Sequence, residues 1–343
     1  MATETQQPAF SAEQMGLFRK LEGIFIPHVC KQRDDFYHRD VASGATAKSA
    51  RFVHYTTAIA ALSIINTKRI WMRNAVCMSD YSEVQHGYDV LHKFFSEETN
   101  TSAFTDALDS SVPGAAGDAF NLFNQRWNNV RFNTYVASVS EHDPKEDLHG
   151  RLSMWRAYGD NTARVALVVN IPWLGQAALA LNLTFSPVAY LTENEAHAAL
   201  QQATANIRAH QDFLRSADRR LVVASAFSML VVWVTCLKHE GFREEREWRA
   251  IYLPHNLASP LMESSTEVIG GVPQFVCKVP LDASVSPALS SLEFSSIFDR
   301  LIIGPSQYPL PMYEAFTAAL MKAGVPQETA KERVLVSGIP LRI

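Results

Sequence analysis

The sequence predicts a soluble, compact α+β protein, and three observations lead to that prediction. Apolar residues make up 47% of the 343 residues and charged residues 19%, as in globular chains and unlike disordered ones. Short apolar runs predict strands, and longer segments with apolar residues at every third or fourth position predict helices. The strands are expected to pair within one sheet.

The first 48 residues are expected to form a helical arm followed by a loop. A helix is predicted because apolar residues recur at helical spacing at Met15, Phe18, Leu21 and Phe25. Residues 33–48 are polar and rich in Ser, Ala and Asp, so they are predicted to form a loop. Residues 49–343 are expected to form a single α+β domain.

Strand patterns begin after this loop and continue to the C-terminal region. Thr57 is expected to start a short helix directly after the first strand. The near-continuous apolar run at 164–171 suits a strand that is buried on both faces. The strands are predicted at residues 51–55, 70–72, 133–140, 164–171, 247–253, 274–279 and 300–303.

Two helical insertions are predicted, at about residues 80–130 and 193–238. Within the first, residues 100–117 hold Ser, Asp, Pro and Gly and are predicted to form an exposed connection. The second is expected to be an antiparallel pair of helices. Residues 221–237 are long and apolar enough to resemble a membrane span, but they are predicted to be a buried core helix because no second span accompanies them.

Charge and cysteine content limit the classes of function. A net charge of −4 and an isoelectric point near 6.3 argue against a broad basic surface for nucleic acid. The four cysteines form no C-x-x-C pair and no secretory signal opens the chain, so reduced thiols and a cytoplasmic location without membrane partners are expected. The sequence contains no P-loop, G-x-G-x-x-G or G-x-S-x-G motif, and it does not determine the oligomeric state.

Glu247 is the most informative single position, because it opens the predicted strand Glu-Trp-Arg-Ala-Ile-Tyr-Leu among cationic neighbours. Strand alternation places Glu245, Glu247 and Arg249 on one face. Two carboxylates on one face can polarise a sugar hydroxyl and stabilise a cationic transition state, and their like charges can raise the pKa of one of them. The alternative is a solvated charge run at the end of an edge strand.

Three further groups carry side chains suited to a site. His54, Tyr55 and Thr56 lie where a strand ends and a helix begins, so hydroxyls and main-chain N–H groups converge there. Each of the three groups also has a structural interpretation, in which its side chains form internal hydrogen bonds or fill the core without binding a ligand. The other two groups are the strand pair Ser138 and Ser140, whose hydroxyls share a face, and the segment of Arg151, Trp155 and Tyr158 on a predicted helix.

A metal site is not expected. Metal-ligand residue types gather between Glu141 and His149, but Pro144 and Lys145 lie among them and the segment has the composition of a polar loop.

The motifs together resemble an uncharacterised bacterial family of unknown function, DUF2971. The resemblance runs from about Phe52 to the C-terminal region. Each motif is short, and their combined order carries the resemblance. The motifs are His-Tyr-Thr-Thr, Ser-Asp-Tyr-Ser-Glu, Ser-Val-Ser-Glu, Met-Trp-Arg-Ala-Tyr-Gly, Glu-Trp-Arg and Ile-Ile-Gly-Pro.

A looser resemblance is to the His-Tyr-Glu lineage of the ADP-ribosyltransferase superfamily, which implies a split or bent sheet core with helical insertions. By that resemblance, His54 binds the adenosine ribose of NAD, Tyr158 stacks on nicotinamide and Glu247 contacts the nicotinamide ribose. Glu245 is similar to the extra acid that orients the acceptor in some members. The sequence departs from the pattern where Tyr55 replaces a glycine, and the long gap after Ser138 makes Trp155 the substitute for Tyr158.

The resemblance implies an NAD-dependent ADP-ribosyltransferase or NAD glycohydrolase, a toxin or phage-defence effector. NAD would be the substrate, no metal would be needed, and the acceptor would be an unidentified protein or nucleic acid. Tyr55, Thr56, Ser138, Ser140, Arg151 and Arg249 are expected to help bind NAD. Two alternatives remain open. One is a non-catalytic nucleotide- or RNA-binding module that uses the same cleft through its arginines and aromatic rings. The other is a nuclease.

Overall fold

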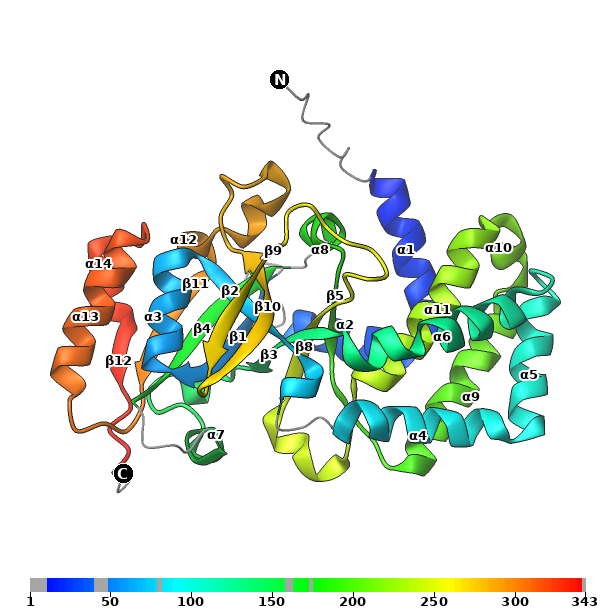
Figure 1. Cartoon of the computed structure of the whole chain (residues 1–343), viewed down its shortest axis with the longest axis horizontal. Helices are drawn as coiled ribbons and strands as arrows, with labels where there is room; N and C mark the ends of the chain where they lie inside the picture. Colours follow the sequence, from blue (N-terminus) through cyan, green and yellow to red (C-terminus); the bar gives the residue numbers. More distant parts are fainter. Residues whose placement is uncertain (1–10, 40–48, 79–81, 158–162, 173–174, 341–343) are drawn as a thin grey trace.

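A ten-stranded sheet is the central element of the chain (Figure 1). The computed structural model describes residues 11–39, 49–78, 82–157, 163–172 and 175–340. Its strands are β1 (Ser49–Thr57), β2 (Arg69–Asn74), β3 (Tyr135–Glu141), β4 (Arg164–Pro172), β5 (Leu183–Pro187), β8 (Glu247–Tyr252), β9 (Glu263–Ile269), β10 (Val272–Pro280), β11 (Phe298–Ile303) and β12 (Val334–Val336). Two short strands, β6 (Ala189–Tyr190) and β7 (Leu237–Lys238), pair separately.

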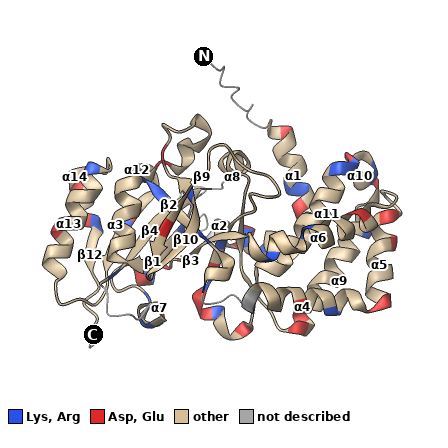
Figure 2. Ribbon diagram, viewed as in Figure 1, with Lys and Arg blue, Asp and Glu red and all other residues tan. Residues whose placement is uncertain are grey.

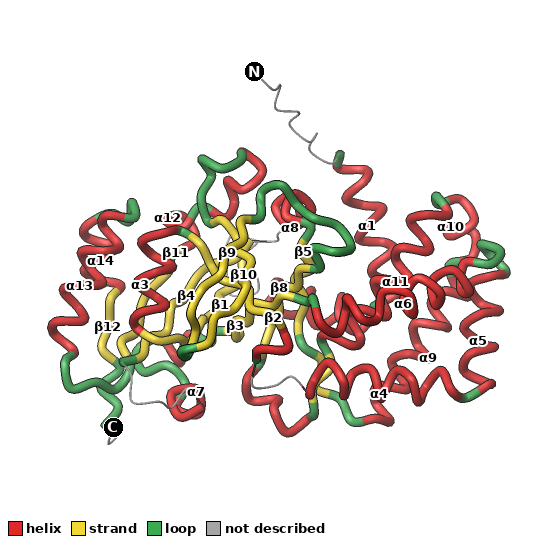
Figure 3. The backbone as a smooth tube through the Cα atoms, viewed as in Figure 1, coloured by secondary structure: helices red, strands yellow, loops and turns green. Residues whose placement is uncertain are grey.

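The strand order is β12-β11-β4-β1-β3-β2-β10-β9, with β8 between β3 and β5. β11 and β12 run parallel, and the other pairs in this sheet are antiparallel. The sheet is therefore mixed, and the predicted α+β class is confirmed. Figure 3 shows the strands gathered together, with helices on both sides.

The sheet divides at the middle of β3. One edge of β3 pairs with β1 through Ser140 and Glu141, and with β2 through Tyr135 and Val136. β1 and β2 therefore diverge from each other beside residues 137–139 of β3. We call this place the fork.

One face of the sheet carries an aromatic core. The ring of Phe52 on β1 lies 5.1 Å from that of Trp248 on β8, measured between centroids, and 5.3 Å from that of Phe185. Helix α2 (Pro27–Arg39) adds Phe36 and Tyr37 to this cluster. The predicted loop at residues 33–48 is therefore wrong over 33–39, because burial of these two rings holds the helix against the sheet; residues 40–48 lie outside the described residues.

Further helices cover the rest of this region and the C-terminal end. Thr57 caps α3 with its hydroxyl, as predicted. The helices of this group are α3 (Ala58–Thr67), α7 (Leu152–Ala157), α8 (Gly175–Leu181), α12 (Phe294–Ile297), α13 (Pro309–Lys322) and α14 (Gln327–Arg333).

A second core lies among helices from three separate parts of the sequence, on the right of Figure 1. The central helix α11 has most of its side chains buried, as the sequence predicts for a core helix. In the part of the chain that is described, no helix is both long and apolar enough to cross a membrane. We call the helices around this second core the helical layer. It consists of α1 (Ala12–Phe25), α4 (Ser82–Ser96), α5 (Glu98–Asp109), α6 (Ala115–Phe132), α9 (Glu193–Ala209), α10 (Gln211–Ser216) and α11 (Arg219–Thr235).

The prediction of an exposed connection at residues 100–117 is wrong, because α5 and the start of α6 occupy it. Phe104, Ala107 and Leu108 recur at positions i, i+3 and i+4 and are almost completely buried. This apolar stripe stabilises the helix despite its polar composition. In the view of Figure 2, acidic and basic segments are interspersed along the outer helices.

Candidate functional site

Three adjacent strands, β1, β3 and β8, carry several of the predicted site residues. Val53 on β1 pairs with Ser140 on β3, and Ser140 pairs with Glu247 on β8. Ser138 pairs with Arg249 in the same ladder. Paired residues and those two positions apart share a face, so both serines, Glu247 and Arg249 lie on one face of the sheet.

His54 lies at the fork. Its Nδ1 atom lies 2.9 Å from the main-chain oxygen of Ser138, and a carbonyl only accepts, so Nδ1 carries the proton. Burial lowers the pKa of His54, and the bond to Ser138 opposes this only in part, so the ring is neutral near pH 7. Its other nitrogen, Nε2, is then an acceptor. By register, the side chain leaves the face opposite Glu247.

Three side chains from the described part of the chain hold Glu247. Its Oε1 accepts from Ser138 Oγ at 2.5 Å and from Arg249 Nε at 2.8 Å. Its Oε2 accepts from Arg249 Nη2 at 3.1 Å and from Lys238 Nζ at 3.5 Å. Only 6% of Glu247 is exposed. The prediction of a solvated charge run is therefore wrong at this residue.

The carboxyl group of Glu247 is ionised at every physiological pH. Burial alone raises its pKa, but the charge and hydrogen bonds of Arg249, the charge of Lys238 and the hydrogen bond from Ser138 outweigh burial and lower the pKa to about 2. From the sequence, the like charges of Glu245 and Glu247 were expected to raise the pKa of one of the two carboxyl groups. For Glu247 the pKa moves in the opposite direction, because the two cations are closer partners.

Glu245 lies in a 3-10 turn, residues 240–245, rather than in the strand. Arg246 follows it in the left-handed conformation, with φ of 46°, and separates the turn from β8. Glu245 still reaches the same cation as Glu247, because Lys238 Nζ lies 2.7 Å from its Oε2. Sequence reasoning missed Lys238, although it is the first charged residue after the uncharged run 221–237.

Short strands β6 and β7 support the start of β8. The main-chain N–H of Glu247 donates to the hydroxyl of Tyr190 at 2.8 Å. Arg249 Nη1 donates to the main-chain oxygen of Thr235, at the end of α11, at 2.7 Å. The site is therefore anchored to both the sheet and the helical layer.

Three residues predicted to bind NAD are part of the internal packing. The Tyr55 hydroxyl accepts from the main-chain N–H of Arg151 at 2.7 Å. Trp155 is 1% exposed, its ring packs edge-on against Tyr55, and its Nε1 donates to the main-chain oxygen of His149. A stacking role for Trp155 would require α7 to move away from the sheet.

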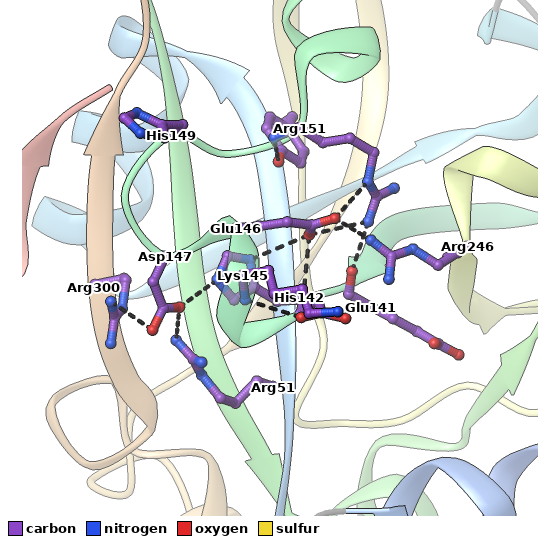
Figure 4. Close-up of polar contacts among 12 residues, drawn as sticks. Arg51, Glu141, His142, Lys145, Glu146, Asp147, His149, Arg151, Arg246 and Arg300 are labelled. Atoms are coloured by element: carbon purple, nitrogen blue, oxygen red, sulfur yellow. Dashed lines mark hydrogen bonds and ion pairs between the residues drawn. The ribbon is translucent and has the colours of Figure 1, made fainter. Parts of the chain in front are cut away.

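Arg151 belongs to a polar network drawn in Figure 4. Its guanidinium donates to the main-chain oxygens of Glu141, Glu244 and Glu245. Its Nε lies 3.1 Å from Glu146 Oε1. Glu146 also pairs with Arg246. The network joins the segment after β3 to the turn before β8.

The residues considered as metal ligands are engaged in the same region. His142 Nε2 lies 2.9 Å from Asp147, and Asp147 also pairs with Arg51 and Arg300. His149 Nδ1 lies 2.5 Å from the main-chain oxygen of Ser337. These contacts hold the 3-10 turn at residues 144–146 against the sheet.

The remaining predicted residues differ in how far they are buried and in whether they are described. Thr56 is partly buried on β1, opposite Val165 of β4. Ser140 is 4% exposed beneath the site. Tyr158 lies outside the described residues. Of the side chains proposed for a binding module, Trp155 and Trp248 are buried and Arg249 is paired with Glu247, whereas Arg243 is exposed and Arg246 is partly exposed.

A cavity of about 320 Å³ lies elsewhere, among α1, α8, β5 and α11. Its lining includes Trp248 but none of the predicted site residues. Because Trp248 leaves β8 on the face opposite Glu247, we assign the chemistry to the Glu247 side and not to this cavity.

Comparison with known proteins supports the resemblance of the motifs to DUF2971. Residues 154–250 match the model of a family described as "Protein of unknown function (DUF2971)". The matched range ends with Glu247 and Arg249 inside it. No curated protein and no solved structure matches the chain.

Proposed function

We infer that this chain, which matches the DUF2971 family over residues 154–250, is an NAD-dependent ADP-ribosyltransferase or NAD glycohydrolase. The observation that supports this function best is a chain of contacts across three adjacent strands. His54 on β1 binds the main chain of Ser138 on β3, and the Ser138 hydroxyl binds the carboxylate of Glu247 on β8. The fork in the sheet also agrees with the split sheet that the superfamily resemblance implies.

The chemistry suits an ionised, fixed carboxylate. The bond between C1′ of the ribose and the ring nitrogen of nicotinamide breaks, and its electron pair leaves with nicotinamide. The ribose then carries positive charge, which the anionic Glu247 stabilises electrostatically. Water or an acceptor group adds to C1′ and releases a proton.

His54 has the protonation state that its proposed role needs. With Nδ1–H committed to Ser138, Nε2 of the neutral ring is an acceptor for a ribose hydroxyl. Because the His54 side chain leaves the face of the sheet opposite Glu247, this contact requires the dinucleotide to pass through the fork between β1 and β2. Tyr158 remains the proposed stacking residue for nicotinamide. The acceptor is proposed to be a protein or nucleic acid, and toxin or phage-defence roles follow from the same resemblance.

The experiment is release of nicotinamide from NAD by the purified chain, compared with the Glu247→Gln variant. Glu247→Gln keeps the shape of the side chain and removes its charge, so turnover should fall at least a hundredfold. The matched control is Glu244→Gln, because Glu244 lies in the neighbouring turn with an exposed side chain. Equal turnover by Glu247→Gln and the unmodified chain would reject the mechanism.

A further inference from the structure

The acid pair shares one buried cation. Lys238 is 1% exposed at the end of β7, and its ammonium group contacts both Glu245 and Glu247. It also lies over the ring of Phe242, 4.8 Å from the ring centroid. A lysine buried this deeply is rare unless its charge is paired.

The two contacts differ in length. Lys238 Nζ lies 2.7 Å from Glu245 Oε2, a normal distance for a charge-assisted hydrogen bond, and 3.5 Å from Glu247 Oε2, at the outer limit of one. The other contacts to the Glu247 carboxylate from described residues are between 2.5 and 3.1 Å. The Lys238 contact is therefore the one that opens most readily.

We propose that Lys238 is a positioning residue: Glu245 holds its ammonium group away from Glu247, so that a hydroxyl of the substrate ribose can take its place at Glu247 Oε2. This proposal rests on the function proposed above. Arg249 keeps the carboxylate in place during the exchange, because it contacts both oxygens. Glu245 thus acts on Glu247 through Lys238, apart from any contact with an acceptor.

Charge balance gives the proposal a specific signature. Among the contacts of the described residues, Glu245 and Glu247 supply two negative charges, and Lys238 and Arg249 supply two positive charges. Glu245→Gln releases Lys238 from its closer partner and moves it onto Glu247. Adding Lys238→Met to that variant removes the cation that competes for Glu247 and leaves the pair of Glu247 and Arg249 in place.

The test measures nicotinamide release from NAD by Glu245→Gln, Lys238→Met, the double variant, Lys238→Arg and the exposed control Lys322→Met. For Glu245→Gln we expect the KM for NAD to rise at least tenfold with a smaller change in kcat. The double variant should recover at least threefold in kcat/KM over Glu245→Gln, and Lys238→Arg should keep a tenth or more of the turnover. Lys322→Met should behave as the unmodified chain.

If Lys238 had only a structural role, the double variant would have the lowest kcat/KM of all the variants. That order, or additive losses of kcat/KM in the double variant, would overturn the proposal. Urea unfolding of the same variants keeps the two proposals separate. If the unmodified chain releases no nicotinamide, the proposed function fails, and coupling between Lys238 and Glu245 still appears as a double-variant urea midpoint above the additive value. Additive midpoints would overturn the role of Lys238 by themselves.

Discussion

Replacing Glu247 by Gln should change the dependence of folding stability on pH. The pKa of Glu247 is about 2 in the folded chain, against an ordinary value of 4.5. A depressed folded-state pKa contributes stability that is fully present above pH 4.5 and is lost as the pH falls through the folded value. The difference in pKa corresponds to about 3 kcal/mol in the free energy of unfolding.

About 2 kcal/mol of this contribution is lost between pH 4.5 and pH 3, because each pH unit in that interval is worth about 1.4 kcal/mol. Urea unfolding at intervals from pH 7 to pH 3 measures it. The free energy of unfolding of the unmodified chain should fall more steeply with acidification than that of Glu247→Gln, so the two curves converge. Other carboxyl groups titrate in both proteins and cancel in the difference.

Glu244→Gln is the matched control, since its exposed side chain should change stability by less than about 0.5 kcal/mol at every pH. Parallel curves for the unmodified chain and Glu247→Gln would refute the reasoning. They would mean that Arg249, Lys238 and Ser138 do not favour the charged form of Glu247 over its form in the unfolded chain.

Three further predictions concern the surroundings of the site. Trp155→Ala should lower the free energy of unfolding by about 3–5 kcal/mol in urea, because the indole is buried between the sheet and α7; a loss below about 1 kcal/mol would contradict its core role. Gly304→Ala should cost about 1–3 kcal/mol in the same assay, because a Cβ atom there would lie 2.9 Å from the Trp155 ring and 3.1 Å from the main-chain oxygen of Arg164; an unchanged urea midpoint would contradict it. The His54 ring should titrate with a midpoint below 6.5 in NMR spectra assigned with His54→Gln, and a midpoint above 6.5 would show that burial does not dominate its pKa.

Strands with strong apolar patterns were predictable from the sequence. β4 appears where a near-continuous apolar run predicts it, because burial on both faces leaves a clear signal, and β1 covers the strand predicted at residues 51–55. Helix α5 was missed because its Ser, Thr and Asp content suggested a loop, whereas the buried stripe around Phe104 decides the structure. Local composition did not reveal that this stripe would meet helices from distant parts of the chain.

The site could be predicted only in part for the same reason. Glu247 and Ser138 carry local signals, since each lies in a recognisable strand with polar side chains on one face. Lys238 carries no such signal, because its role depends on β7 returning beside the start of β8. Trp155 was the substitute for Tyr158 as the stacking residue, with core filling as the alternative, because sequence spacing does not distinguish a ring that faces a ligand from one that fills a core.

The position of Arg249 decides which chemistry Glu247 suits. Two residues apart on one strand, their side chains share a face, so the guanidinium reaches both carboxylate oxygens. Arg246, in its left-handed conformation, takes Glu245 out of that row and leaves Lys238 between the two acids. A carboxylate held ionised in this way is a poor proton donor near neutral pH, because its pKa is far below 7. Its permanent charge instead suits the stabilisation of a cationic sugar, which the proposed cleavage of the nicotinamide–ribose bond requires, rather than general-acid catalysis at Glu247.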